Sequence, residues 1–517
     1  MYTMIPVLLL GFLAQAVQEP RTPQETVAKL KAPEGFAVTL FAGEPDVRQP
    51  ISFAFDDRGR LWVAEALSYP SWTPEGKDRI LVFEDADGDG RFDRRSVFFE
   101  GLTYVTGIEV GFGGVWVIAP PRMLFIPDRN GDDRPDGPPE VLLDGFGLQG
   151  GHNIANGFTW GPDGWLYAGH GRTSISDLGA PGTPPEKRLH FDGGVWRYHP
   201  TRHVVEAFAD GTTNPWGVAF DDHGQILITN CVNPHLFHAV QGAHFEPWRG
   251  RESSRFAYKR IDSIADHLHW IGKIEAGRDG SEAQLAAGGG HAHCGAMIYL
   301  GDSFPDAYRG HVYTSNLHGH RINQDLVRRK GSGFAASHGP DLLISSDKMF
   351  MALHLQYGPD GSVTLIDWYD RGECHTRTPH RESGRIYKMT YKGTPVAKPD
   401  LAKLSNDELV KLQLHKNDWY VSHARRLLQE RKAEVSGPLL KILGEHPDQT
   451  RKLRALWALQ VTGAVTPELR LKLLDSPHEY LRAWAIQLEM EGRGAAPAKF
   501  AEMARKDPSP VVRLYLA

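Results

Sequence analysis

The sequence predicts an all-β six-bladed β-propeller followed by an all-α, HEAT-like helical solenoid. Three observations support this prediction: a strand–turn–strand unit occurs six times, the units recur at a similar distance, and the hydrophobic periodicity becomes helical after a Pro-rich hinge. Small sheets repeated at such a distance are typical of a propeller. The units are 50 to 78 residues apart when anchored on Phe55, Val110, Trp160, Phe220, Ile298 and Tyr357.

Each unit consists of two short apolar strands joined by a tight turn. At 161–164 and 358–361 the turn reads Gly-Pro-Asp-Gly, which places Pro at the second and Gly at the fourth position, as a type I turn prefers. The strand pattern continues to Lys392, so we predict that the propeller spans residues 33–392.

The N-terminus, residues 1–16, is predicted to be a signal peptide. An apolar run from Ile5 to Ala14 is followed by the small-x-small pattern Ala14-Gln-Ala16. The run is shorter than the ~20 residues that span a bilayer. We therefore expect a periplasmic or secreted chain, or one associated with a membrane, without a transmembrane helix beyond the signal segment.

Composition excludes some classes of protein. A net charge of −5 gives no reason to expect nucleic acid as a partner. Only three cysteines occur, Cys231, Cys294 and Cys374, which argues against a disulfide framework and favours buried free thiols. No Cys-x-x-Cys-His motif is present, so the sequence predicts no haem site within this chain.

The C-terminal part, residues 400–517, follows a Pro-rich hinge at 393–399 and has helical periodicity. Four similar amphipathic segments carry arginines 28 to 31 residues apart, and this period predicts HEAT-like repeats. An unrelated helical bundle is the alternative. The last repeat stops inside an apolar helix at Ala517, so we expect a truncated solenoid that continues in the natural protein. The arginines are Arg425, Arg454, Arg482 and Arg513.

Two acidic loops resemble calcium-binding loops. Each places oxygen-bearing side chains at positions 1, 3, 5 and 9, a spacing that wraps ligands around a hard cation. The first loop has Gly90 at its sharp turn, whereas the second has Asp133 there. Solvated acidic turns without an ion are the alternative. The predicted ligands are Asp85, Asp87, Asp89 and Asp93 in the first loop, and Asp128, Asn130, Asp132 and Asp136 in the second.

Chemistry is expected at one mouth of the central channel, where residues flank the innermost strands. His152 is the strongest candidate for a catalytic base, because an imidazole can take a proton from a substrate hydroxyl near neutral pH. Structural roles are the alternative for any single member of the set. The predicted mouth residues are Gln49, Glu65, Thr106, His152, Asn153, Asn156, His170, Arg172, Asn214, Trp216, Asn230, His291, His293, Asn316, His318, Arg321 and Arg371.

Residues 35–392 resemble the propeller of a membrane-bound dehydrogenase family of planctomycete-type bacteria. The resemblance lies in Phe-Glu-Asp-Ala-Asp-Gly-Asp-Gly at 83–90, Phe-Thr-Trp-Gly-Pro-Asp-Gly-Trp-Leu-Tyr at 158–167, Ile-Asp-Trp-Tyr at 366–369 and Gly-Arg-Ile-Tyr at 384–387. It implies that the chain continues into HEAT-like helices, and that a c-type cytochrome domain or protein is its partner.

The chain also resembles, more distantly, the glucose/sorbosone dehydrogenases, which are six-bladed propellers that hold pyrroloquinoline quinone (PQQ). This resemblance implies that His152 is the base, and that PQQ contacts Arg172, Asn214, His318 and Arg321. The chain departs from that family at several positions where the family has a cationic residue. Thr213, Met349 and Met351 stand at or near positions of family arginines, and His318 stands near the position of a family lysine.

Three hypotheses for function follow. The first is an exported dehydrogenase-like propeller that oxidises a sugar or polyol, holds a quinone and passes electrons to a c-type cytochrome. The second is a non-enzymatic propeller that binds glycans or acts as a scaffold. The third is a calcium-dependent, lactonase-like hydrolase, in which Glu65, Asn156 and Asn214 hold the metal ion.

Overall fold

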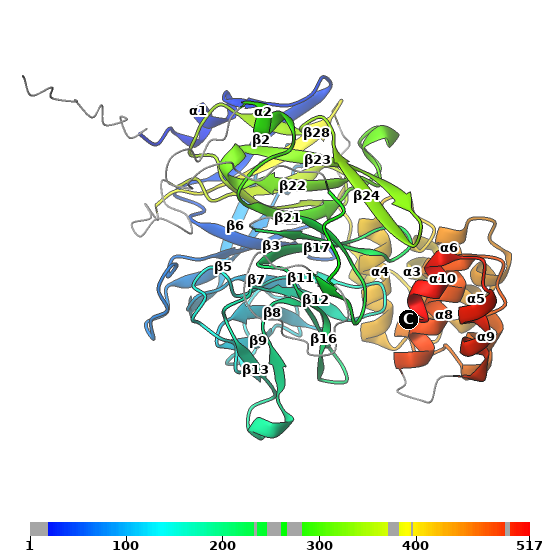
Figure 1. The fold of residues 1–517 in the computed structure, drawn as a ribbon. Coiled ribbons are helices and arrows are strands. Elements are labelled where there is room, and N and C mark those ends of the chain that lie inside the picture. Colours follow the sequence, from blue (N-terminus) through cyan, green and yellow to red (C-terminus); the bar gives the residue numbers. More distant parts are fainter. Residues whose placement is uncertain are drawn as a thin grey trace, which may run out of the picture.

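A computed structural model of the chain describes residues 19–231, 235–245, 260–265, 282–370, 382–393, 397–491 and 497–517. These residues form a β-propeller and a group of helices that packs beside it (Figure 1). The predicted signal segment, 1–16, lies outside the described residues, as do Arg371 and Cys374.

Six sheets form a closed ring, which confirms the predicted number of blades. The first strand of each blade contacts the first strand of the next, and the last of these, β26, contacts β3 again. A ring of this kind leaves no exposed inner edge. The innermost strands are β3 (Pro50–Phe55), β7 (Gly107–Val110), β11 (Ala155–Trp160), β17 (Pro215–Phe220), β21 (His293–Ile298) and β26 (Ala352–Tyr357).

Each blade continues outward through antiparallel strands. The second strands are β4 (Leu61–Glu65), β8 (Gly114–Ala119), β12 (Leu166–His170), β18 (Ile226–Asn230), β22 (Val312–Asn316) and β27 (Val363–Asp367). The third strands are β5 (Asp78–Glu84), β9 (Arg122–Pro127), β15 (Gly194–His199), β19 (Leu236–Ala239), β23 (Arg321–Lys330) and β28 (Arg385–Tyr391). Blades one and two add a fourth strand, β6 (Arg94–Leu102) and β10 (Glu140–Asp144), and blade five adds β24 (Gly333–His338) and β25 (Leu343–Ser345). Blade three adds β16 (Val204–Gly211) and β20 (His244–Phe245), which is parallel to β16. Strands β13 (Ser176–Leu178) and β14 (Leu189–Phe191) form a separate two-stranded sheet.

The N-terminal part of the chain closes the ring. Strand β2 (Phe36–Gly43) pairs along the whole of β28 and forms the outer strand of blade six, and β1 (Leu30–Lys31) joins blade five. The closure is held by Arg385, which is fully buried, lies 3.1 Å from the ring of Tyr369 and bonds to Glu44 at 2.7 Å. The sequence repeats did not predict this pairing.

The repeated turns have a shared cause in their aspartates. In four of the six inner hairpins an Asp side chain accepts a hydrogen bond from the backbone amide two residues later, which is an Asx turn. Such a turn fixes the chain reversal without help from neighbouring blades, so the same pattern can recur in several hairpins. The donors and acceptors are Arg58 to Asp56, Trp165 to Asp163, His223 to Asp221 and Ser362 to Asp360.

Glycines allow the innermost strands to approach one another. A Cβ atom on Gly217 would lie 2.3 Å from the amide nitrogen of Ala296, and one on Gly295 would lie 2.8 Å from the carbonyl oxygen of Leu353. Both glycines also have positive φ, at +144° and +61°, and both lie at a bulge in their strand.

The C-terminal helices occur as consecutive pairs, with α4, α6, α8 and α10 in contact one after another. This pairing is the arrangement that helical repeats produce, and the HEAT-like assignment stays a prediction. The helices are α3 (Asn406–Leu412), α4 (Asp418–Arg431), α5 (Ser436–Glu445), α6 (Gln449–Val461), α7 (Pro467–Leu473), α8 (Glu479–Glu491), α9 (Ala498–Lys506) and α10 (Pro510–Tyr515), and two short helices, α1 (Pro23–Val27) and α2 (Glu282–Ala286), belong to the propeller part.

Helices α4 and α8, with the residues before α4, cover the end of the propeller where the six inner hairpins turn. Every blade offers a backbone group at its turn to a group of the helical region. The six contacts are Phe55 O with His423 at 3.1 Å, Phe112 N with Glu430 at 2.8 Å, Gly164 O with Gln429 at 3.1 Å, His223 O with Trp484 at 2.8 Å, Leu300 O with the amide of Asp418 at 3.0 Å, and Gly358 O with Asn417 at 3.0 Å.

Buried ion pairs reinforce this contact. Arg454 of α6, fully buried, lies 2.9 Å from Asp222 of the propeller, 3.1 Å from Asp418 and 2.7 Å from His415 O. Arg197 of β15 pairs with Asp163 at 3.2 Å and with Glu491 of α8 at 3.3 Å. Because unpaired charges cannot remain buried, these pairs fix the position of the helices.

The buried arginine makes a direct test of this contact. We expect Arg454→Met to lower the free energy of unfolding by about 1.5–3 kcal/mol, because the buried guanidinium loses two ion pairs and its bond to His415 O, while Asp222 keeps its pair with Arg309. The matched control Arg470→Met, which removes a half-buried pair with Glu489 inside the helical region, should cost less than about 1 kcal/mol. Thermal unfolding of both variants measures the difference, and equal losses would contradict the account.

The covered end of the channel holds a buried acid. Glu109 of β7 lines a cavity there with His354, His423 and Arg426. Burial raises the pKa of Glu109 to about 8, opposed by a bond from the amide of Val110 and by the charge of Arg426. Burial also lowers the pKa values of His354 and His423 to about 4, so both imidazoles are neutral near pH 7.

The raised pKa of Glu109 predicts a pH dependence of stability. The folded protein holds this proton up to about pH 8 and the unfolded chain only to about pH 4.5, so the stabilisation is complete below pH 4.5 and is lost as the pH rises through 8. Relative to the native chain, Glu109→Gln should therefore be more stable at pH 9 than at pH 5, by on the order of 2–5 kcal/mol. Melting curves at the two pH values test this, with exposed Glu140→Gln as the control. A variant whose relative stability does not change with pH would contradict it.

Candidate functional site

A cleft of about 100 Å³, open to solvent, lies at the other mouth of the channel. All six blades contribute to it, at or just before the start of their innermost strand, whereas the hairpin turns lie at the end of that strand. The cleft and the covered face are therefore opposite ends of one channel. The contributing residues at the strand starts are Ile51, Thr106, Ile154, Asn214, Ala292 and Leu353.

The wall of the cleft is mainly apolar and aromatic, with a polar group on one side. Its aromatic members are Tyr69, Tyr104, Trp216 and Trp368. Of the predicted mouth residues, the structure brings six to the cleft wall: Thr106, His152, Asn153, Asn214, Trp216 and His291. An apolar cleft with a few convergent polar groups is the usual form of a small-molecule site.

His152 is held in place by its neighbours on adjacent blades. The side-chain amide of Asn214 donates to His152 O at 3.3 Å, and the hydroxyl of Tyr104 donates to Gly151 O at 2.8 Å. Asn214 is positioned in turn by Asn230, whose side-chain oxygen accepts a hydrogen bond from the backbone amide of Asn214 at 2.5 Å. The predicted base and the predicted cofactor contact are therefore neighbours.

Two buried oxygens at this cleft have no hydrogen-bond partner among the described residues. They are Oδ1 of Asn153 and Oδ1 of Asn214. Since a buried polar atom without a partner costs free energy, both are suited to accept hydrogen bonds from a ligand. Hydroxyl groups are donors of the appropriate kind.

Arg172 is close to this group in the chain fold, although it does not line the cleft. Its backbone amide donates to Thr213 O at 2.8 Å, next to Asn214. The residue is 3% exposed, and in the part of the chain that the structure describes neither terminal guanidinium nitrogen has a partner. A buried cation in this state is suited to an anionic group.

Two further predicted cofactor contacts lie in blade five. His318 is buried, and its ring centroid is 5.2 Å from that of His291, which lines the cleft. Arg321 forms an ion pair with Asp341 at 2.7 Å and donates to Gly319 O. Its guanidinium thus has a structural role at the start of β23.

Several other mouth residues also hold strands together. Glu65 pairs with Arg79 at 2.5 Å and accepts from the amide of Arg48. Asn156 donates to the carbonyl oxygens of Ile154 and Pro215. Other mouth residues bond to backbone carbonyl oxygens: Gln49 to Ser383 O, His293 to Gly288 O and Asn316 to Gly289 O. His170 bonds to the hydroxyl of Ser176, and burial lowers the pKa of His170 to about 4.

The sequence analysis missed the apolar part of the cleft. Tyr69, Tyr104 and Trp368 resemble ordinary core residues in the sequence, because an aromatic residue beside a strand is usually buried there. Burial raises the pKa of Tyr104 to about 12, so its hydroxyl stays a donor. The cysteines Cys231 and Cys294 also line the cleft.

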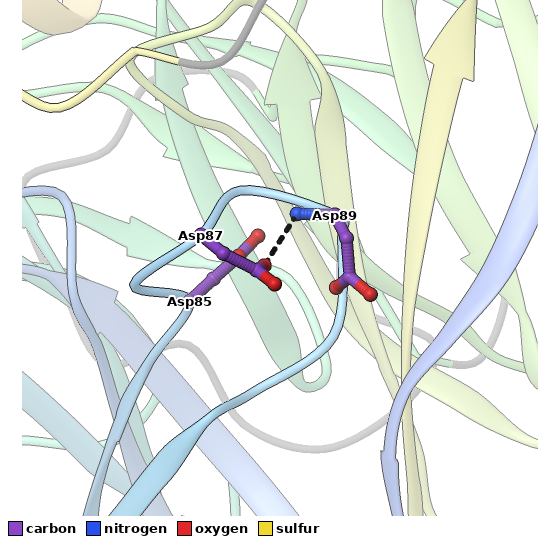
Figure 2. Close-up of side chains that lie close together, drawn as sticks. All are labelled: Asp85, Asp87 and Asp89. Carbon is purple, nitrogen blue, oxygen red and sulfur yellow. Dashed lines mark hydrogen bonds between the residues drawn. The ribbon is translucent and has the colours of Figure 1, made fainter.

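The first acidic loop brings three carboxylates together (Figure 2). Ligand oxygens of Asp85, Asp87 and Asp89 all lie within 4.8 Å of one another, between β5 and β6. The loop is shaped by its own bonds: Asp85 accepts from the amides of Gly88 and Gly90 at 2.6 and 3.0 Å, and Asp93 accepts from the amide of Ala86. These residues fit a hard cation such as calcium.

The second loop lies in the same place in blade two, between β9 and β10. It repeats the internal bonds, with Asp128 and Asn130 both accepting from the amide of Asp132 at 3.2 and 3.1 Å, and Asp136 accepting from the amide of Arg129. Asp133 adopts a positive φ of 63° where the first loop has Gly90, and its carboxylate is bound by Arg60. Among the described residues, the carboxylates of the second loop do not form a group like that of the first loop.

A family model described as a domain of unknown function, DUF7133, matches residues 22–393. The chain belongs to the DUF7133 family. No curated protein matches the chain. Among the described residues, no helix has the length and apolar character needed to cross a bilayer.

Solved structures similar to this DUF7133 propeller include sugar dehydrogenases. A glucose dehydrogenase-type oxidoreductase from Thermus thermophilus has a TM-score of 0.45 and 16% identity, over 69% of this chain and 100% of that one. The PQQ-bound aldose sugar dehydrogenase of Streptomyces coelicolor has a TM-score of 0.44 and 16% identity, over 70% of this chain and 99% of that one. The soluble aldose sugar dehydrogenase of Escherichia coli has a TM-score of 0.42 and 11% identity, over 69% of this chain and 99% of that one. Similarities of this size carry no argument about activity.

The described wall of the cleft in this DUF7133 chain offers no cationic side chain to PQQ. PQQ carries three carboxylates, which are normally bound by arginine and lysine. Among its described lining residues the cleft has neither residue type. Thr213, Met349 and Met351 are buried at 6%, 3% and 7% exposure and carry no charge.

The two acidic loops of the DUF7133 propeller provide a matched test for calcium. Millimolar calcium should raise the melting temperature of the native chain, because an ion that binds only the folded state stabilises it. Asp87→Asn should remove most of this rise, and Asp132→Asn, in the second loop, should remove little of it. Equal responses of the three proteins in differential scanning calorimetry would contradict the assignment to the first loop.

Proposed function

We propose that this chain is an exported, dehydrogenase-like propeller that oxidises a sugar or polyol in the cleft. The observation that carries the proposal is the group of His152, Asn153 and Asn214 on one side of an otherwise aromatic cleft. A sugar has hydroxyl groups for the polar side and C–H faces that pack on aromatic rings. Export rests on the predicted signal segment.

The proton transfer is assigned to His152. Oxidation of an alcohol to a carbonyl breaks an O–H and a C–H bond, and a neutral imidazole accepts the hydroxyl proton as a general base. The unpartnered Oδ1 atoms of Asn153 and Asn214 accept hydrogen bonds from neighbouring hydroxyls and so orient the substrate. Tyr104 and Asn214 hold the loop that carries the base through bonds to Gly151 O and His152 O.

The electrons must go to an acceptor that these side chains do not provide. The absence of cations among the described lining residues argues against PQQ bound in the pose of its known enzymes, so no step is assigned to that cofactor. A two-electron acceptor of the quinone class would take the hydride from the C–H bond, and a c-type cytochrome domain or protein belongs to this proposal as the final, one-electron acceptor. Arg172 lies outside the described cleft wall, so its contact with a cofactor stays a prediction.

A second candidate function is binding of a glycan without turnover. The observation that favours it is the same lack of cations in the described cleft wall, together with aromatic rings on which sugars can pack. The lactonase-like hydrolase is less favoured, because Glu65, one of its three predicted metal ligands, is paired with Arg79 and accepts from the amide of Arg48. The Oδ1 atoms of Asn156 and Asn214 have no partner among the described residues, so the carboxylate of Glu65 is the group that decides against a metal ion there.

His152 provides the test of the proposed reaction. With a panel of aldoses and polyols and an artificial electron acceptor, His152→Gln should lower kcat by about 100-fold or more and change KM little, as expected for loss of a general base. Asn214→Ala should mainly raise KM. The control is His190→Gln, an exposed histidine on β14 that bonds to Asp177.

Calorimetric titration of the same sugars separates the two candidates. Sugar binding to the native chain without dye reduction under any acceptor would favour the binding function. Activity that persists in His152→Gln at the native rate would contradict the assignment of the base.

A further inference from the structure

Two cysteines from different blades meet in the wall of the cleft. Cys231 directly follows β18 of blade four, and Cys294 belongs to β21 of blade five. Their Sγ atoms are 3.1 Å apart, and both residues are buried, at 9% and 3% exposure. Both also line the cleft that carries His152 and Asn214.

The backbone, and not the sulfurs, fixes this proximity. The amide of Cys231 donates to Asn214 O at 2.8 Å, and Cys231 forms an antiparallel bridge with Ala292, two residues before Cys294. Cys294 is itself paired with Ser315 in the ladder between β21 and β22. The strands on both sides therefore hold the two cysteines next to each other in every conformation that keeps the blades intact.

We propose that Cys231 and Cys294 are a redox pair that closes to a disulfide bond between blades four and five. An S–S bond is about 2.05 Å long, so side-chain rotations that bring the two Sγ atoms roughly 1 Å closer are enough to form it. The position is unlike that of a cysteine in a closed core, because both residues line a cleft that is open to solvent.

The oxidant belongs to the class of small organic disulfides. The thiolate of one cysteine attacks a sulfur of the oxidant, its S–H proton goes to water, and one thiol of the oxidant leaves. The second cysteine then displaces the other thiol from the mixed disulfide. In total two S–H bonds and one S–S bond break in the two partners, one protein S–S bond forms, and two electrons and two protons reside on the two thiols released.

Closure has a consequence for the cleft. The bond joins the residue after β18 to the first strand of blade five, across the chain segment 232–293, and so restrains the unfolded chain. The wall next to Asn214 becomes rigid, since Cys231 is bonded to Asn214 O. This inference does not depend on the proposed sugar oxidation.

The test uses the full chain with Cys374→Ser, so that only the pair remains, and dithiodipyridine as the oxidant. A pair should release about two thiopyridones for each reagent molecule consumed and leave a protein lighter by two hydrogens without an adduct. Non-reducing digestion should then yield one peptide pair joined at Cys231 and Cys294, and the melting temperature should rise and return with dithiothreitol.

Single variants show whether the sulfurs act together. Cys231→Ser and Cys294→Ser, each with Cys374→Ser, should retain a stable thiopyridine adduct on the remaining cysteine. An adduct on both cysteines of the pair-containing chain, or no reaction of the folded chain at excess reagent, would overturn the proposal. A disulfide already present in the purified chain would support it.

Discussion

The contact between the helices and the six hairpin turns is the constraint on which the rest of the structure depends. Every blade presents a backbone group at its turn, and residues from 417 to 484 bind one group from each. Backbone groups at a turn depend little on side-chain identity, so six different turns form one continuous surface. The charges of Arg454 and Arg197 are buried only because this surface and the helices meet. One end of the channel is thereby closed.

The closed end determines where chemistry can occur. The cleft that holds the predicted polar residues lies at the opposite mouth, where the six inner strands begin and where their first residues form its wall. Within it, polar groups are concentrated at His152, Asn153 and Asn214, and the aromatic rings and the two cysteines form the remaining wall. The arrangement supports a ligand with both hydroxyl groups and an apolar face. The acidic loops lie at outer hairpins of blades one and two, so calcium there would stabilise the blade edge and not take part in the reaction.

The sequence predicted the propeller well because its strongest pattern has a local cause. Asp163 and Asp360 form Asx turns within their own hairpins, so the turn pattern is visible without knowledge of the neighbours. Contacts between distant parts of the chain left no such pattern. The pairing of β2 with β28 is set by the closure of the ring, and the meeting of Cys231 with Cys294 is set by the contact between neighbouring blades. Of the polar residues predicted at the mouth, those that bond to strands and those that face the cleft look alike in sequence.

The amide of Phe112 gives the most direct test of the central contact. This residue lies in the turn after β7, and its amide donates to the carboxylate of Glu430 in α4 at 2.8 Å. Hydrogen exchange with residue resolution on the full chain should show this amide protected to nearly the level of β7 and β8, because it opens only when the helices leave the propeller. Exchange at the rate of an exposed turn, while the neighbouring strands stay protected, would contradict the account.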